Sequence, residues 1–257
     1  MKIVTFNVNS VRVRAGILAE FLQRESPDVV ALQETKCEDG VFPRAEFEAL
    51  GYHVACDGQK TYNGVALLTR EPLTRVKTGF GDPNMPDDKR IIGAEIQGIW
   101  VLNTYVPNGT KVGGDKWDYK MRWLERFREM IAPGLDRGLP IVWLGDINIA
   151  PEPIDVYDSA KVLGGVGHHP DEFARLKAIT DLGLIDSFRK LHPEPGHYSY
   201  WDFFIKNAVD RGLGWRIDHI YVSPNLEPRV QRAWIDLEPR RKERPSDHTP
   251  VILELAD

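Results

Sequence analysis

Two polar side chains follow an apolar run near the middle of the chain. Residues 140–144 have the composition of a strand buried on both faces, and Gly145 follows them. Asp146 and Asn148 come next, and residues two apart in an extended chain point to the same side. The pair therefore predicts a carboxylate and a carboxamide converging on one reacting centre. Asp, Asn and Gly are also turn residues, so an ordinary turn explains this stretch equally well when it is taken alone.

Similar polar residues follow, precede or lie within several other apolar runs. Carboxylates and carboxamides without a neighbouring Lys or Arg are oxygen ligands of the kind that Mg²⁺ prefers. An imidazole among them titrates near neutral pH, and a carboxylate could orient it. Each residue has an ordinary structural explanation, as a cap, a loop residue or a buried hydroxyl. A site without function would require all of these explanations to hold at once. The residues are Asn7, Glu34, Tyr105, Asp218, Asp247 and His248.

The elements that must position these residues are short strands interrupted by few helices. Because too many strands separate the helices for a doubly wound sheet, the pattern predicts two sheets packed face to face with helices outside. Helices are expected at 11–24, at 115–131 with Asp115 as a possible cap, and at 171–182. Strands are expected at 2–6, 28–33, 52–57, 64–69, 73–79, 91–96, 99–105, 140–144, 215–223 and 250–255.

Bulk composition narrows the class of protein. The 257 residues, 42% of them hydrophobic, show no repeat or composition break, so a single domain over 1–257 is expected. No apolar run is long enough to span a membrane, and the N-terminus turns polar too soon for a signal peptide. Two cysteines make no disulfide framework and suit a reducing cytoplasm. The net charge of −5 does not exclude a nucleic-acid enzyme, because a basic groove can coexist with an acidic far side. No two histidines have the spacing of a helical zinc site, so the sequence predicts no zinc.

Six ordered motifs resemble those of the exonuclease III branch of the endonuclease/exonuclease/phosphatase superfamily. The resemblance extends from residue 1 to residue 255. It implies a DNase I-like, four-layered α/β sandwich in which helices flank two packed mixed β-sheets. The motifs are Phe6-Asn7-Val8-Asn9-Ser10, Leu32-Gln33-Glu34-Thr35-Lys36, Tyr105-Val106-Pro107-Asn108, Gly145-Asp146-Ile147-Asn148, Trp215-Arg216-Ile217-Asp218 and Ser246-Asp247-His248.

The same resemblance implies a Mg²⁺-dependent phosphodiesterase acting on double-stranded DNA, with Mn²⁺ able to substitute. Expected activities are cleavage 5′ to abasic sites, 3′→5′ exonuclease action, and removal of 3′ blocking groups as a 3′-phosphatase or phosphodiesterase. By position, Glu34 would be the principal metal ligand, with Asn7 and Asp247 near the ion. Asp146 would orient or deprotonate the attacking water, and Asn148 would support it.

The remaining catalytic roles also come from the resemblance. His248, held by Asp218, would contact the scissile phosphate, and Tyr105 would bind phosphate or assist the leaving oxygen. Asn9 lies where some relatives have Asp, which could alter metal affinity. The loop 109–116 and the segment 201–215 vary in length among relatives, so the resemblance does not specify substrate preference.

Candidate DNA-binding residues are basic or aromatic side chains near these motifs. Trp215 and Tyr200 could wall a pocket for an extruded abasic sugar. Strand alternation opposes this, because residues 215 and 218 fall on opposite faces unless a bulge intervenes. Trp117 could be core or a wedge into a groove, and the basic run 240–244 leads into the last motif. The polar candidates are Asn108, Arg90, Lys111, Lys116, Lys120 and Arg216.

Two other functions compete with the repair nuclease. A relative acting on phosphoinositides, sphingomyelin or poly(A) would carry different residues around Asp218 and Asp247. A nucleic-acid-binding regulator on the same fold, catalytically weak, should have lost acidic ligands. Glu34 and Asp146 are both present, as are the other acidic candidates, so the nuclease is favoured. Nothing in the chain demands a partner subunit, and a monomer is expected.

Overall fold

Two six-stranded mixed β-sheets form the centre of the computed structural model, which describes residues 1–256. Strands β1–β2 and β7–β8 pair in parallel, and the other neighbours are antiparallel. The first sheet has the order β11 (Val230–Ile235), β12 (Val251–Leu255), β1 (Lys2–Asn7), β2 (Val29–Gln33), β4 (Val65–Thr69) and β3 (His53–Asp57). The second has the order β5 (Thr74–Thr78), β6 (Ile91–Ile96), β7 (Ile99–Tyr105), β8 (Ile141–Asp146), β10 (Asp218–Val222) and β9 (Ile185–Asp186).

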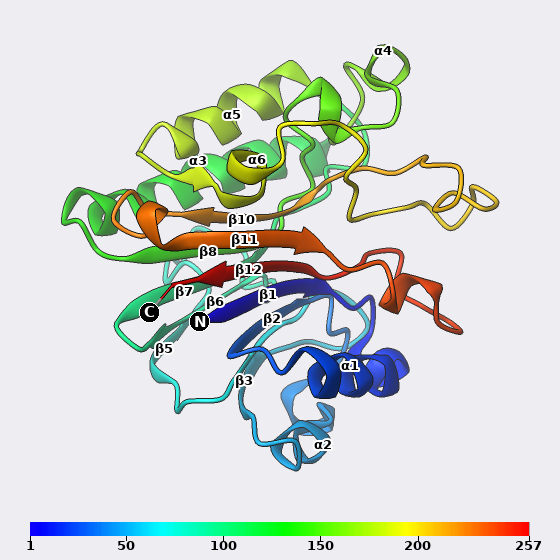
Figure 1. The fold of residues 1–257 in the computed structure, drawn as a ribbon. Coiled ribbons are helices and arrows are strands. Elements are labelled where there is room, and N and C mark those ends of the chain that lie inside the picture. The colour runs from blue at the N-terminus through cyan, green and yellow to red at the C-terminus, as the bar shows by residue number, and fades with distance from the viewer. Residues whose placement is uncertain (257) are drawn as a thin grey trace.

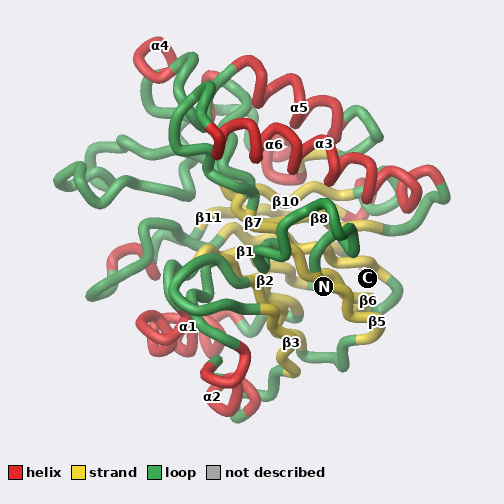
Figure 2. The backbone as a smooth tube through the Cα atoms, turned by 180° about the vertical axis from the view of Figure 1, so that it is seen from behind, coloured by secondary structure: helices red, strands yellow, loops and turns green. Residues whose placement is uncertain are grey.

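Helices cover the outer face of each sheet, so the fold has four layers (Figure 1). Figure 2 shows the same order of layers from behind. This confirms the predicted four-layered α/β sandwich of the DNase I type. Helices α1 (Val11–Glu25) and α2 (Arg44–Glu48) lie on the side of the first sheet. On the side of the second lie α3 (Asp115–Asp136), α5 (Pro170–Thr180) and α6 (Ser187–Leu191), with the short α4 (Ser159–Val162) at one end.

Helix α3 shows why the periodic apolar positions form a helix here. Its buried face includes Trp117, Leu124 and Ile131, which recur at helical spacing and pack against the second sheet. Burying such a side chain stabilises the fold by roughly 1.5–3 kcal/mol. The expected cap at Asp115 is wrong, because Gly114 is the N-cap residue and no side chain caps the helix. Within residues 1–256, no helix is long and apolar enough to cross a membrane.

The two sheets meet in an apolar layer that also contains a polar bridge. Gln33 of β2 donates from its amide to Asn103 Oδ1 of β7 at 2.7 Å. The Asn103 amide in turn donates to the carbonyl oxygens of Leu32 and Ala66, at 2.9 and 3.0 Å. Because buried polar groups must be paired, this bridge favours one register between the sheets. It therefore fixes β2 relative to β7, and the ends of both strands carry candidate site residues.

Several short elements escaped the sequence patterns. Strand β11 is half-exposed and contains a bulge between Val230 and Arg232, which obscures its alternation. Helices α2 and α6 have five residues each, too few to show a helical period. The strand expected at 215–223 begins only at Asp218, because Trp215 forms isolated bridges with Val156 and Tyr200 instead of joining the sheet.

Candidate active site

Five of the candidate side chains lie at one edge of the paired sheets. Asn7 ends β1 and Glu34 directly follows β2, its parallel neighbour. Tyr105 ends β7, beside Asp146 at the end of β8. Asp218 begins β10, which is antiparallel to β8, and pairs in register with Asp146. The carboxyl ends of two parallel strand pairs thus meet here, and the antiparallel strand contributes its first residue.

Asn7 connects the acidic residues of the two sheets. Its amide nitrogen donates to Glu34 Oε1 and to Asp146 Oδ2, both at 2.9 Å. Its amide oxygen accepts the backbone N–H of Asn9 at 3.0 Å. Ligand atoms of Glu34, Asp146 and His248 all lie within 4.8 Å of one another. Two carboxylates and one imidazole therefore face a common point at the junction of the sheets.

Lys36 corrects the expectation that the carboxylates lack a neighbouring cation. Its ammonium nitrogen lies 2.8 Å from Glu34 Oε2 and donates to Asn9 Oδ1 at 2.6 Å. Glu34 and Lys36 both have left-handed backbone conformations, with φ of 50° and 53°. Such conformations are uncommon outside glycine and concentrate at functional sites. This tight turn returns the lysine to the carboxylate, and no pattern in the sequence indicates that.

Asn148 converges with Asp146 for a different reason from the one expected. The strand ends at Asp146 and Asn148 has φ of 54°, so the stretch is a turn and not extended chain. The backbone N–H of Asn148 donates to Asp146 Oδ1 at 3.0 Å. The Asn148 amide donates to the carbonyl of Val106 and accepts from Asn108, both at 3.0 Å. The turn thus holds the Asp146 carboxylate and places Asn108 at the exposed margin of the site.

His248 and Asp218 form a hydrogen-bonded pair, as expected. His248 Nδ1 donates to Asp218 Oδ2 at 2.8 Å, and its Nε2 lies 3.7 Å from Asp146 Oδ2. The hydroxyl of Ser199 also donates to Asp218 Oδ2, at 2.7 Å. Ser199 is a member of the site that the sequence did not indicate, because serine in a loop carries no distinguishing pattern.

Burial and neighbouring charges shift the protonation of this centre. Burial lowers the pKa of His248, but the adjacent carboxylates of Asp218 and Asp146 outweigh it and raise the pKa to about 10. Burial raises the pKa of Asp146 to about 7. The charge of His248 opposes this rise, and the charges of Asp218 and Glu34 add to it. At neutral pH the centre accordingly holds an imidazolium beside a carboxylate that binds protons unusually well.

Tyr105 lies at the same centre, and its phenol is protonated. Burial raises its pKa well above the usual value, and the charges of Glu34 and Asp146 raise it further. The guanidinium of Arg90 lies over the Tyr105 ring, 4.7 Å from its centroid, and donates to the Tyr105 carbonyl at 3.1 Å. Arg90 also pairs with Asp88. Arg90 therefore supports the tyrosine, and a direct DNA contact remains a prediction.

Comparison with known proteins identifies the family. The model of the Endonuclease/Exonuclease/phosphatase family matches residues 4–248. Exodeoxyribonuclease III of Haemophilus influenzae is 36% identical, over 99% of both chains. The chain belongs to the endonuclease/exonuclease/phosphatase family. It lies in the exonuclease III and AP endonuclease branch of that family.

Two solved structures of this branch share the fold closely. An AP endonuclease from Archaeoglobus fulgidus has a TM-score of 0.95 and 42% identity, covering 99% of both chains. The 3′ phosphatase NExo from Neisseria, bound to a product DNA hairpin, has a TM-score of 0.96 and 38% identity over the whole of both chains. The two six-stranded sheets described above are thus those of a family member.

Asp247 lies beside the centre of this family member without joining its carboxylate group. Its Oδ1 accepts from the Asn9 amide at 2.9 Å, and Asn9 in turn accepts from Lys36. The backbone carbonyl of Asp247 accepts the N–H of Trp201 at 2.9 Å. The chain of contacts from Asp247 through Asn9 and Lys36 ends at Glu34. Its role near a metal ion stays a prediction.

Two predicted phosphate contacts are wrong because both side chains are buried in ion pairs. Lys120 is fully buried, 2.5 Å from Glu172, and donates to the carbonyl oxygens of Asn108 and Asn148. Arg216 lies 2.7 Å from Asp155 and 2.8 Å from an Asp186 oxygen. Trp117 belongs to the core and makes a T-shaped contact with His169, so it is not a wedge. Lys111 and Lys116 are exposed and remain candidates for DNA contacts.

The buried Arg216 leads to a stability prediction. Arg216→Ala would remove the cation that Asp155 and Asp186 share. Because Arg189 still pairs with Asp155, we expect a loss of about 3 kcal/mol, the lower end of the range for a broken buried ion pair. Arg232→Ala is a matched control, because Arg232 is exposed and should change stability by less than about 0.5 kcal/mol. Denaturant unfolding measures both. A loss below about 1 kcal/mol for Arg216→Ala would show that the cluster does not stabilise the fold.

Tyr200 lies between Trp215 and His248. Their backbones exchange two hydrogen bonds of 2.9 Å, and Tyr200 also bridges to His248, with ring centroids 4.9 Å apart. Trp215 is half-buried and packs in a small cluster with Val156 and Ile217. Because Trp215 lies outside β10, strand alternation no longer opposes its position near the site. A pocket wall remains the prediction for both rings.

Proposed function

We propose that this family member is a metal-dependent DNA-repair phosphodiesterase that cleaves 5′ to abasic sites and trims or unblocks 3′ ends of duplex DNA. The observation that carries the proposal is the intact centre of Glu34, Asp146 and the His248–Asp218 pair. Its relatives named exodeoxyribonuclease III, AP endonuclease and 3′ phosphatase support the substrate class. The site takes residues from both sheets, from Asn7 to His248, which supports one catalytic domain over 1–257.

The donor set fits a divalent cation, and we propose Mg²⁺, with Mn²⁺ as a substitute. Glu34 and Asp146 offer oxygen atoms near one point, which suits a hard cation. Glu34 would hold the ion, with Asp247 nearby. Asn7 is proposed to hold the two carboxylates apart, and it can bind the ion only if its amide turns over, since the amide nitrogen faces them. When bound, the cation would stabilise charge on the phosphoryl oxygens.

Side chains of the centre supply the other catalytic roles in phosphodiester hydrolysis. Asp146 accepts the proton of the attacking water, and its raised pKa of about 7 makes it a stronger base than an exposed aspartate. Asn148 holds that carboxylate through its backbone N–H. The imidazolium of His248, held by Asp218, stabilises the charge that develops on the phosphate. The protonated phenol of Tyr105 donates to phosphate or to the leaving oxygen.

Removal of the metal tests the proposal most directly. A duplex with a single abasic site should be cleaved in Mg²⁺ and should stay intact in excess chelator, because Lys36 is held by Glu34 and Asn9 and its single charge does not replace that of a divalent cation. Added Mg²⁺ should restore cleavage in the wild type but not in Glu34→Ala. Cleavage that persists in chelator would refute the metal requirement. DNA binding without cleavage in any divalent metal would favour the regulator, and hydrolysis of phospholipids or poly(A) alone would favour the other branches.

Trp215 offers a test of lesion recognition. If its ring walls the pocket for an abasic sugar, Trp215→Ala should reduce the preference for abasic over intact duplex by roughly tenfold, since a loosened pocket rejects normal nucleotides less well. The melting temperature should change little. Trp234→Ala is the control, a half-buried tryptophan of β11. A large fall in melting temperature with an unchanged preference would assign Trp215 to the core.

Two further proposals concern the state of the protein. Cys37 and Cys56 are free, which suits the reducing cytoplasm that we propose as its location. The site is assembled within one chain, so we propose a monomer. Light scattering of the purified protein with and without duplex DNA measures the mass directly, and a dimer mass would refute the second proposal.

A further inference from the structure

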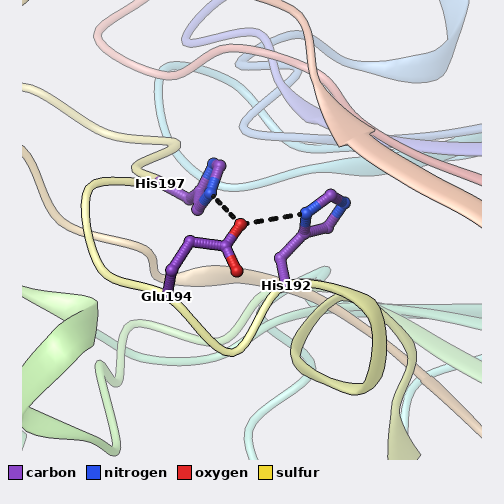
Figure 3. A group of neighbouring side chains, drawn as sticks. All are labelled: His192, Glu194 and His197. Atoms are coloured by element: carbon purple, nitrogen blue, oxygen red, sulfur yellow. Dashed lines mark hydrogen bonds and ion pairs between the residues drawn. The ribbon is translucent and has the colours of Figure 1, made fainter.

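A cluster of two histidines and a glutamate lies in the loop that follows α6, outside the catalytic centre (Figure 3). His197 Nε2 lies 2.8 Å from Glu194 Oε1, and His192 Nδ1 lies 3.3 Å from the same oxygen. All three side chains are partly exposed, by 31% for His192, 53% for Glu194 and 34% for His197. Three potential ligand atoms thus converge where an ion from solvent can reach them.

The second nitrogen of His192 provides an independent indication of a ligand. His192 Nε2 donates to the carbonyl oxygen of Ala233 in β11 at 2.7 Å. In a neutral imidazole this leaves the unshared pair on Nδ1, the nitrogen that faces Glu194. A lone pair facing a carboxylate oxygen is repelled by it unless a proton or a metal ion lies between them, so this pair of atoms can accept a metal ion in place of a proton. Histidines that bind metals commonly donate their other N–H to a backbone carbonyl in this way, which fixes the ring orientation.

The surrounding chain holds the three ligands in place. Both imidazoles pack against the buried Phe188, with centroid distances of 4.6 Å to His192 and 5.3 Å to His197. Arg189 donates to the carbonyl oxygens of His192 and Glu194, both at 2.9 Å, and is itself paired with Asp155. Gly196 has φ of 92°, a conformation that favours glycine and turns the chain back toward the other ligands. The three ligands are therefore held by contacts that do not depend on a bound ion.

We propose that His192, Glu194 and His197 form a binding site for a divalent transition-metal cation of the zinc type. Two imidazoles and one carboxylate are a ligand set that Zn²⁺ accepts and that Mg²⁺ disfavours, with water completing the coordination. The sequence predicts no zinc because these histidines lack helical spacing. The loop supplies the convergence that a helix would otherwise provide.

A bound ion would act on the segment that leads into the catalytic centre. Only Tyr198 separates His197 from Ser199, whose hydroxyl donates to Asp218. The backbone N–H of Thr249, next to His248, donates to the Ser199 carbonyl at 2.8 Å. An ion that holds His197 would therefore restrain the backbone between His197 and Ser199. The site would stabilise the position of the His248–Asp218 pair without touching substrate.

Equilibrium dialysis of the full chain against Zn²⁺, in excess Mg²⁺, tests the site. Wild type should bind one more zinc ion than His197→Ala, while His53→Ala, which removes an exposed histidine of β3, should bind as the wild type does. Glu194→Gln should lower the affinity for this zinc ion at least tenfold. Zinc bound at the catalytic centre is common to all variants and cancels in the comparison.

Hydrogen exchange gives a second readout that does not depend on nuclease activity. Zinc should slow exchange in residues 193–200 of the wild type and of His53→Ala, but not of His197→Ala. Melting temperatures measured without zinc should be alike, which excludes misfolding of the variants. Equal zinc stoichiometry in wild type and His197→Ala, or equal exchange with and without zinc in the wild type, would overturn the proposal. Neither outcome bears on the proposed cleavage of DNA.

Discussion

Asp146→Asn should lower the turnover of bound abasic duplex by at least about a hundredfold, the usual contribution of a general base. The substitution keeps the shape of the side chain, so Oδ1 can still accept from the backbone of Asn148. It removes the charge and the proton-accepting oxygen that lies beside Asn7 and His248. DNA affinity should change far less than turnover. Single-turnover kinetics and a binding titration separate the two effects.

The pH dependence of the wild type provides a further check on Asp146. The carboxylate accepts a proton only when it is ionised, so activity should fall as the pH drops through its pKa. That value is about 7 without a metal ion, and a bound cation would move the fall to lower pH. Asp136→Asn, at the exposed end of α3, should keep wild-type turnover. Normal turnover of Asp146→Asn with weakened binding would make Asp146 a binding residue.

Asp218 and His248 should behave as one unit, although they are thirty positions apart in sequence. His248→Ala removes the imidazolium from the phosphate site and should lower turnover by roughly a hundredfold or more. Asp218→Ala should cause a similar loss, because it removes the carboxylate that orients the ring and keeps its pKa near 10. The double variant should then be little worse than the poorer single one, since losses within a unit are not additive.

A double-mutant cycle measures this coupling. His53→Ala should retain wild-type turnover and shows the effect of losing an unrelated histidine. The Asp218 variants need a stability measurement as well, because Ser199 loses its buried acceptor in them. Multiplicative losses in the double variant would mean that the two residues act independently, and the pairing would then be structural only.

Local sequence patterns predict the class of fold and most of the residues that the structure brings together at the site. Apolar runs ending in Asn7, Glu34, Tyr105 and Asp146 indicated strands that carry polar residues at their ends, and the structure places those ends at one edge. This succeeded because strand periodicity and strand termination are local properties of the chain. The family model that matches residues 4–248 spans all of these strand ends.

Which charged side chains are free to bind a ligand depends on contacts across the fold. Lys120 and Arg216 look like phosphate ligands in the sequence, but their partners Glu172 and Asp155 are 52 and 61 positions away. Lys36 is near Glu34 in sequence, yet only a left-handed turn brings it to the carboxylate. Ion pairing depends on distances across the fold, and residue type alone does not encode those distances.

The tertiary structure also decided how side chains converge outside regular elements. Asn148 meets Asp146 through a turn, and Trp215 reaches Tyr200 through an isolated bridge, where strand alternation predicted other geometries. His192 and His197 converge because Gly196 reverses a loop anchored on the core. Periodicity describes helices and strands alone. Where backbone dihedrals leave those regions, the position of a side chain follows from the contacts of the folded chain.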